Sequence, residues 1–387
     1  MKLIYTLSLL FMTVLLNSQT NSLIINPGIS LPKDSVEREK LIRSLNEFLK
    51  AGQKPNEENK FVFEEEKIET FILLDEINGI EKSETFNISD FYKPYLTNIV
   101  SLKENQFLIS ISYIGVNENK ALLRACFTLI GHKTGDSYTF SSSLLRNTEN
   151  WKVEKIGSHT FHYQNTINKK NVSEYGRLIT LYDTKLNVPN HPTDYYLTSN
   201  IIELQKLIGV DYKSDYNGIV NSIWTSSLGN RKLIVYGNNN SKFDSFDPHD
   251  LFHDRLSIMI PRNKVNKPVD EGCAYLYGGS WGLSWEEIFR AFKEQVASNK
   301  KMDWKDVKEN PIYFKTKEFN NSADYIVNAL LVKKIEQEKG FAGVWELLTV
   351  GPVEKGNEKY YQTLEKLTGI TKANYNEKVW ELINKEK

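Results

Sequence analysis

Residues 247–271 constrain the fold of this chain more than any other stretch. Asp247 is a favourable helix N-cap and Pro248 suits the first helical position, so a helix is predicted to begin here. His249 and His253 then lie four residues apart, on one face of that helix. This spacing lets both imidazoles reach a single metal ion.

Glu271 follows His253 by eighteen positions and begins a second predicted helix. Its carboxylate would be the third ligand of a His-His-Glu set, which is a typical set for zinc. The histidine pair taken alone also fits two surface or capped histidines. Asp270 either caps the second helix or orients a ligand histidine.

The composition is that of an ordinary globular protein. A chain of 387 residues with 40% hydrophobic and 12% aromatic residues can form two domains with a sizeable core. Lys+Arg and Asp+Glu are equal at 49 each, so no general attraction to nucleic acid or to an anionic membrane is expected.

The N-terminus has the form of a secretory signal peptide, predicted at residues 1–19. Lys2 precedes the apolar residues 3–16, and small Ser18 lies near a plausible cleavage point. The chain is therefore expected to be secreted or periplasmic, with a retained anchor as the alternative, and no later run could span a membrane. Cys126 and Cys273 are interpreted as two small buried thiols, and a disulfide is the alternative.

The distribution of strand and helix patterns predicts an α+β protein. Residues 20–150 are predicted to form a β-rich N-terminal domain, with strands at 61–63, 70–74, 107–113 and 122–128. Residues 151–387 are predicted to form a second domain with a small sheet followed mostly by helices. Nothing in the sequence indicates the role of the first domain or an oligomeric state.

The second domain resembles the gluzincin zinc metallopeptidases, the thermolysin-like and aminopeptidase-like group that includes peptidase-MA-like domains. The resemblance lies in HDLFH at residues 249–253, DEGCAY at 270–275 and the helical residues 323–348. The family motif is HExxH on one helix, then N/D/S-E-G-x-A/S on the next. The resemblance covers residues 160–387 and implies zinc held by His249, His253 and Glu271.

The chain departs from the family at Asp250, which stands where the family has its catalytic glutamate. The resemblance implies that Asp250 is the general base for the attacking water, and capping of its helix is the structural alternative. The aspartate is shorter by one methylene, about 1.5 Å. Tyr325 is the candidate for stabilising the oxyanion, with simple packing as its alternative.

These observations lead to two hypotheses. The first is an exported zinc metallopeptidase that hydrolyses a peptide or protein substrate, with Asp250 as its base. The second is a catalytically inactive, zinc-binding or scaffold protein of the cell envelope, and the same Asp250 supports it. Replacing Asp250 by Glu separates them, because an inert template could gain activity and an adapted enzyme should lose it.

Overall fold

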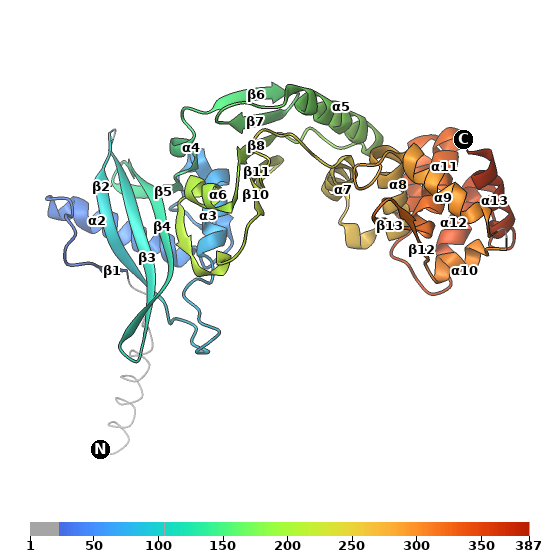
Figure 1. Cartoon of the computed structure of the whole chain (residues 1–387). Coiled ribbons are helices and arrows are strands. Elements are labelled where there is room, and N and C mark those ends of the chain that lie inside the picture. The colour runs from blue at the N-terminus through green and yellow to red at the C-terminus, as the bar shows by residue number, and fades with distance from the viewer. Residues whose placement is uncertain (1–22, 104, 300, 387) are drawn as a thin grey trace, which may run out of the picture. The chain divides into compact units, whose positions relative to one another are not determined.

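The computed structural model describes residues 23–103, 105–299 and 301–386. They form two compact units (Figure 1). Unit 1 contains the described residues up to Ile167 and also His191–Lys242. Unit 2 contains Asn168–Asn190 and the described residues from Phe243 onward.

The first sheet of unit 1 packs against helix α2 (Ser35–Ala51). Its strands are, in order, β1 (Ile24–Ile25), β2 (Lys93–Ser101), β3 (Gln106–Asn117), β4 (Lys120–Thr134) and β5 (Ser137–Ser142), with β9 (Val210–Lys213) paired to β4. Ala125, Phe127 and Leu129 alternate along β4 and are buried, as the period of two in a strand requires. Phe48 of α2 meets Phe140 of β5 with ring centroids 5.2 Å apart.

The second sheet of unit 1 is mixed. Its order is β10 (Ser222–Leu228), β11 (Arg231–Gly237), β8 (Thr193–Thr198), β7 (His159–Tyr163) and β6 (Lys152–Ile156). Strand β8 pairs parallel with β11 and with β7, while the two outer pairs are antiparallel. Helix α6 (Ile201–Ile208) packs on β11 (Figure 1).

Helix α3 (Lys67–Ile77) corrects the strand predicted at residues 70–74. The helix contacts β5 of the first sheet and β10 and β11 of the second, so nearly all of its residues are buried. A helix covered on all sides has no polar face, and its apolar run then lacks the helical period that would distinguish it from a strand. Residues 61–63 form only a single bridge, from Val62 to Phe140.

Unit 2 is mostly helical. Its helices are α5 (Lys169–Leu186), α7 (Pro248–Met259), α8 (Lys267–Gly278), α9 (Trp285–Ala297), α10 (Trp304–Glu309), α11 (Ala323–Leu348), α12 (Glu358–Thr368) and α13 (Tyr375–Lys385). The 3-10 turn η4 (Arg262–Lys264) joins α7 to α8, and β12 (Tyr313–Thr316) and β13 (Phe319–Ser322) form a hairpin. Helix α8 packs against both α7 and α11. Short turns elsewhere are η1 (Asn56–Glu58), η2 (Glu64–Glu66), α4 (Leu144–Asn147) and η3 (Ser214–Tyr216).

The α+β prediction is confirmed, with a β-rich N-terminal region followed by helices. The compact units do not divide at the predicted boundary between residues 150 and 151, because the strands from β6 to β11 belong to unit 1. The predicted signal peptide at 1–19 lies outside the described residues.

Cys126 in unit 1 and Cys273 in unit 2 are both free thiols. Among the helices of the described residues, none has the length and apolarity to cross a membrane.

Candidate metal centre

Helix α7 begins as predicted and carries both histidines. The Asp247 carboxylate accepts a hydrogen bond from the backbone N–H of His249 at 2.9 Å, and Pro248 occupies the first turn. The helix is fixed to α5 by Arg255, which is buried and forms a bidentate pair with Asp183 at 2.6 and 2.8 Å. These contacts set the position of the histidine-bearing face.

Helix α8 begins at Lys267, four residues before Glu271, so Asp270 is not its N-cap. Asp270 instead lies inside the helix with only 1% of its side chain exposed. Its Oδ1 atom accepts a hydrogen bond from Nδ1 of His253 at 2.8 Å. Asp270 therefore contacts His253 and does not cap α8, and its role in orienting a ligand histidine stays a prediction.

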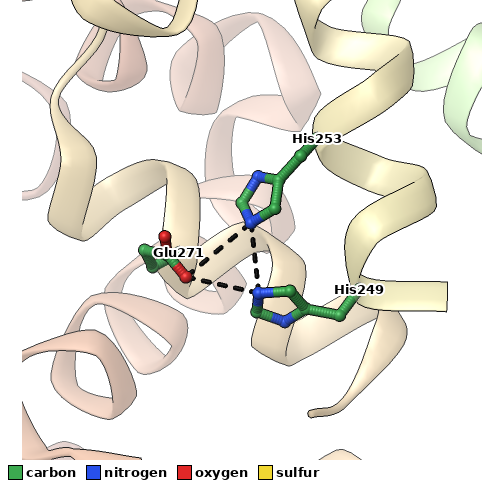
Figure 2. A group of neighbouring side chains, drawn as sticks. All are labelled: His249, His253 and Glu271. Carbon is green, nitrogen blue, oxygen red and sulfur yellow. Dashed lines mark hydrogen bonds and ion pairs between the residues drawn. The ribbon is translucent and has the colours of Figure 1, made fainter. Parts of the chain in front are cut away.

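The structure brings His249, His253 and Glu271 together, and they are the group within the described residues that could hold a metal ion. Figure 2 shows the two imidazoles from α7 and the carboxylate from α8 converging on one point. The Nε2 atoms of the histidines are 3.1 Å apart, and Oε2 of Glu271 lies 3.3 Å from one and 3.7 Å from the other. Side-chain exposure is 12, 8 and 14%, respectively.

The outer nitrogen of each imidazole fixes which atom faces inward. Nδ1 of His249 is 2.8 Å from the carbonyl oxygen of Gly279, which can only accept, and Nδ1 of His253 meets the Asp270 carboxylate. Both Nδ1 atoms are therefore assigned as donors, which leaves the Nε2 atoms to present lone pairs. Two nitrogen lone pairs and a carboxylate oxygen would then face one another, an arrangement that either a proton or a metal ion between them makes favourable.

The electrostatics of the group agree with a need for positive charge. Burial by itself lowers the pKa of His253, but its contacts with Asp270 and Glu271 raise that pKa to about 9. Burial raises the pKa of Glu271, and its contacts with His249 and His253 more than offset this and hold that pKa well below its usual range. In the absence of a metal ion, a proton supplies the positive charge.

Arg262 of η4 is a neighbour of the centre that the sequence analysis missed. One of its terminal nitrogens lies 2.9 Å from Oδ2 of Asp270, 3.2 Å from Oε1 of Glu271 and 3.4 Å from Nε2 of His253. The guanidinium thus contacts the outer oxygen of Glu271, while Oε2 faces the two histidines. The sequence does show that Arg262 lies in the short connection between the two helices that carry His249, His253 and Glu271. It does not show that the Arg262 side chain points toward these residues, because that depends on the conformation of the η4 turn.

Asp250 is exposed on the first turn of α7, next to His249. At the start of α7, the Asp247 side chain caps the helix, and Asp250 does not form the capping-box hydrogen bond that its position allows.

Tyr325 is half-buried and packs edge-on against Tyr275, with ring centroids 6.0 Å apart. Burial and then the charge of Glu271 raise the pKa of Tyr325 to about 12. The catalytic roles of Asp250 and Tyr325 stay predictions.

No protein-family model matches this chain, and comparison with curated proteins finds no match. The resemblance to gluzincins stays a prediction from the sequence.

Proposed function

We propose that unit 2 is a gluzincin-like zinc peptidase domain, in which His249, His253 and Glu271 hold the ion and Asp250 is the general base for peptide hydrolysis. The observation that supports this most directly is the set of three inward-facing acceptor atoms, 3.1–3.7 Å apart and largely buried. Such a set is unfavourable without a cation and suits a metal ion bound by nitrogen and oxygen.

The donor set and its dimensions favour zinc. Zinc bonds of about 2.0–2.1 Å in a tetrahedron separate neighbouring ligand atoms by about 3.3–3.4 Å. The three observed separations, 3.1, 3.3 and 3.7 Å, lie on both sides of that value. Calcium and magnesium prefer oxygen ligands, so two imidazole nitrogens argue against them. Three protein ligands are also the number found in catalytic zinc sites, whereas structural sites have four.

Each nearby side chain has a chemical task in this proposal. A zinc ion bound by His249, His253 and Glu271 would supply Lewis-acid chemistry, which polarises a carbonyl group and makes water more nucleophilic at neutral pH. Asp250, exposed beside His249, takes the proton from the attacking water and returns it to the leaving amine. Arg262 keeps 43% of its side chain exposed and can stabilise negative charge that develops on the carbonyl oxygen. Tyr325 can donate a hydrogen bond to the same oxygen.

The second candidate is a zinc-binding scaffold without activity, and Asp250 is the observation that favours it. A carboxylate displaced by about 1 Å from its productive position can lose on the order of 100-fold in rate. The helix would need to shift to compensate for the shorter side chain. In this alternative the metal stabilises unit 2, and the exposed Asp250 has no chemical task.

Metal analysis of the purified protein tests the site. After zinc is supplied at neutral pH and excess is removed, the wild type should retain about one zinc per chain, and Glu271→Gln should retain far less. His162→Gln is the matched control, because His162 also pairs with a carboxylate, Asp194 at 3.1 Å, but lies in unit 1. A wild type that retains no zinc would rule out both candidates.

Peptide cleavage by the zinc-loaded protein then separates the two candidates. An adapted enzyme should cleave, and Asp250→Ala should lose activity by about 100-fold or more while it retains zinc. If the protein is a scaffold, the wild type and Asp250→Ala should both be inactive, and Asp250→Glu could then create activity. Cleavage that is unchanged in Asp250→Ala would contradict the role assigned to this carboxylate.

A further inference from the structure

Trp281 lies in a tight turn just after α8, where tryptophan is an unusual residue. Ser280 and Leu283 exchange both backbone hydrogen bonds, with N–O distances of 3.0 and 2.9 Å. Between them Trp281 has φ +55° and Gly282 has φ +73°. Two successive positive φ values are those of a type I′ turn, whose first central position favours Asn, Asp or Gly. The turn itself gains nothing from a tryptophan, so the indole ring requires another explanation.

The indole ring has one supported face and one open face. It stacks on Phe319 of β13, with ring centroids 5.1 Å apart and planes inclined by 3°. Trp281 nevertheless remains 58% exposed, which is high for the largest apolar side chain. Because Phe319 covers one face of the ring, the exposed remainder offers an apolar surface to solvent.

The turn is connected directly to the candidate metal centre. Gly279, two residues before Trp281, accepts the hydrogen bond from Nδ1 of His249 at 2.8 Å. Gly279 has φ +73°, and a Cβ atom there would lie 2.0 Å from the carbonyl oxygen of Leu283, so the backbone is fixed in this path. The position of the indole ring is thus linked through a few backbone bonds to that of a metal ligand.

The β12–β13 hairpin that carries Phe319 also adjoins the centre. Tyr313 on β12 is 67% exposed. Asn321 on β13 accepts a hydrogen bond from the hydroxyl of Tyr275 on α8 at 3.2 Å, and the ring of Tyr275 meets that of His249 with centroids 5.4 Å apart. The hairpin that carries Phe319 and Tyr313 is thus joined through Tyr275 to a proposed metal ligand.

We propose that Trp281 and Phe319 form a stacking subsite that binds an aromatic side chain of the peptide substrate beside the metal centre. The inference rests on the proposed peptidase function, and it names a preference that the metal ligands alone do not supply. A flat side chain stacks on the open face of Trp281, while the peptide backbone passes the metal. Trp281 is a specificity residue in this account and takes no part in proton transfer.

Cleavage of a mixture of peptides, with the cleaved bonds identified by mass spectrometry, tests the preference without a known substrate. The zinc-loaded wild type should favour Phe, Tyr or Trp at one fixed position relative to the cleaved bond. Trp281→Asn removes the ring and suits the type I′ turn, so it should fold and lose that preference. Trp281→Phe should keep it. Val220→Asn, at a residue of unit 1 that is 71% exposed, is the matched control.

A peptide from that mixture and its analogue with Ala at the aromatic position provide the kinetic measurement. Trp281→Asn should raise KM for the aromatic peptide by roughly 2- to 13-fold, the range of one aromatic pair, and leave kcat and the Ala peptide nearly unchanged. Active enzyme with no aromatic preference, or with a preference that survives in Trp281→Asn, would overturn the subsite and leave the proposed function standing.

Binding without cleavage keeps the subsite testable if hydrolysis is absent. Two Ala-rich hexapeptides, with a central Phe or a central Ala, are compared by equilibrium binding to the wild type and Trp281→Asn. Tighter binding of the Phe peptide, lost in the variant, supports the subsite even if the peptidase proposal fails. Equal binding overturns it. Binding of a linear gluco-oligosaccharide that depends on Trp281, with no peptide binding, would overturn it in favour of a sugar ligand.

Discussion

Replacing Asp270 by Asn tests how the metal centre is oriented, because this residue contacts two different donors. Oδ1 accepts from Nδ1 of His253 at 2.8 Å, and Oδ2 accepts from Nε of Arg262 at 3.0 Å. Asparagine has the same shape but only one oxygen. If that oxygen keeps the bond to His253, the amide NH2 group faces the guanidinium, and two donors oppose each other. The substitution must therefore break one of the two contacts.

The expected magnitude follows from the role of each contact. Loss of the carboxylate partner of a ligand histidine typically weakens metal binding by about 10- to 100-fold, which corresponds to roughly 1.4–2.7 kcal/mol. Asp270 is almost fully buried, so the opposed donors should also lower the free energy of unfolding of the metal-free protein by about 1–3 kcal/mol. Glu271→Gln should weaken zinc binding more strongly, since it removes a ligand.

The affinity is measured by competition with a chromogenic zinc chelator, and stability by urea unfolding of the metal-free protein. Asp194→Asn is the matched control, because Asp194 also joins a histidine and an arginine: His162 at 3.1 Å and Arg231 at 3.5 Å. That variant should bind zinc like the wild type. If Asp270→Asn also binds zinc like the wild type while Glu271→Gln does not, the orienting role assigned to Asp270 is refuted.

Three further predictions concern stability. Gly272→Ala places a Cβ atom 2.8 Å from the backbone N of Ala329 on α11. Urea unfolding should show that the free energy of unfolding falls by about 1–3 kcal/mol. An unchanged urea midpoint would contradict the close contact between α8 and α11. Burial lowers the pKa of His132 from 6.5 to about 4, so the unfolded chain binds more protons between these values. Stability should then fall by up to about 3 kcal/mol as pH decreases from 6.5 to 4, and His132→Gln, compared over the same range, should lack this component of the slope. Lys308→Met leaves the buried Asp324 carboxylate without its partner 3.5 Å away and should lower the free energy of unfolding by about 3–5 kcal/mol. The double variant with Asp324→Asn should recover most of this loss. A double variant as unstable as Lys308→Met alone would argue against the pair.

The grouping of His249, His253 and Glu271 could be predicted from the sequence because local geometry decides most of it. A cap at Asp247 fixes where α7 begins, and the helical period then places His249 and His253 on one face. Glu271 needed one further assumption, that two adjacent helices joined by a short connection pack together. The structure meets that assumption, since α7 and α8 are in contact.

The surroundings of the ligands depend on contacts that the sequence does not encode locally. Arg262 reaches Asp270 and Glu271 only because η4 turns its side chain toward the centre. Helix α3 was mistaken for a strand because tertiary burial removed its polar face. The extent of unit 1 also depends on contacts between distant residues: β6 and β7 pair with each other, and the parallel ladder from β7 to β8 joins them to the later strands.

The two parts of the proposed function rest on residues under different physical constraints. His249, His253 and Glu271 are largely buried, and their facing acceptor atoms need a proton or a metal ion between them, so this group could hold a metal ion. Asp250 is exposed in the first turn of a helix, where a carboxylate is favourable with or without catalysis. The geometry thus argues more strongly for metal binding than for hydrolysis. Activity of Asp250 variants that retain zinc is therefore the measurement that decides between an enzyme and a scaffold.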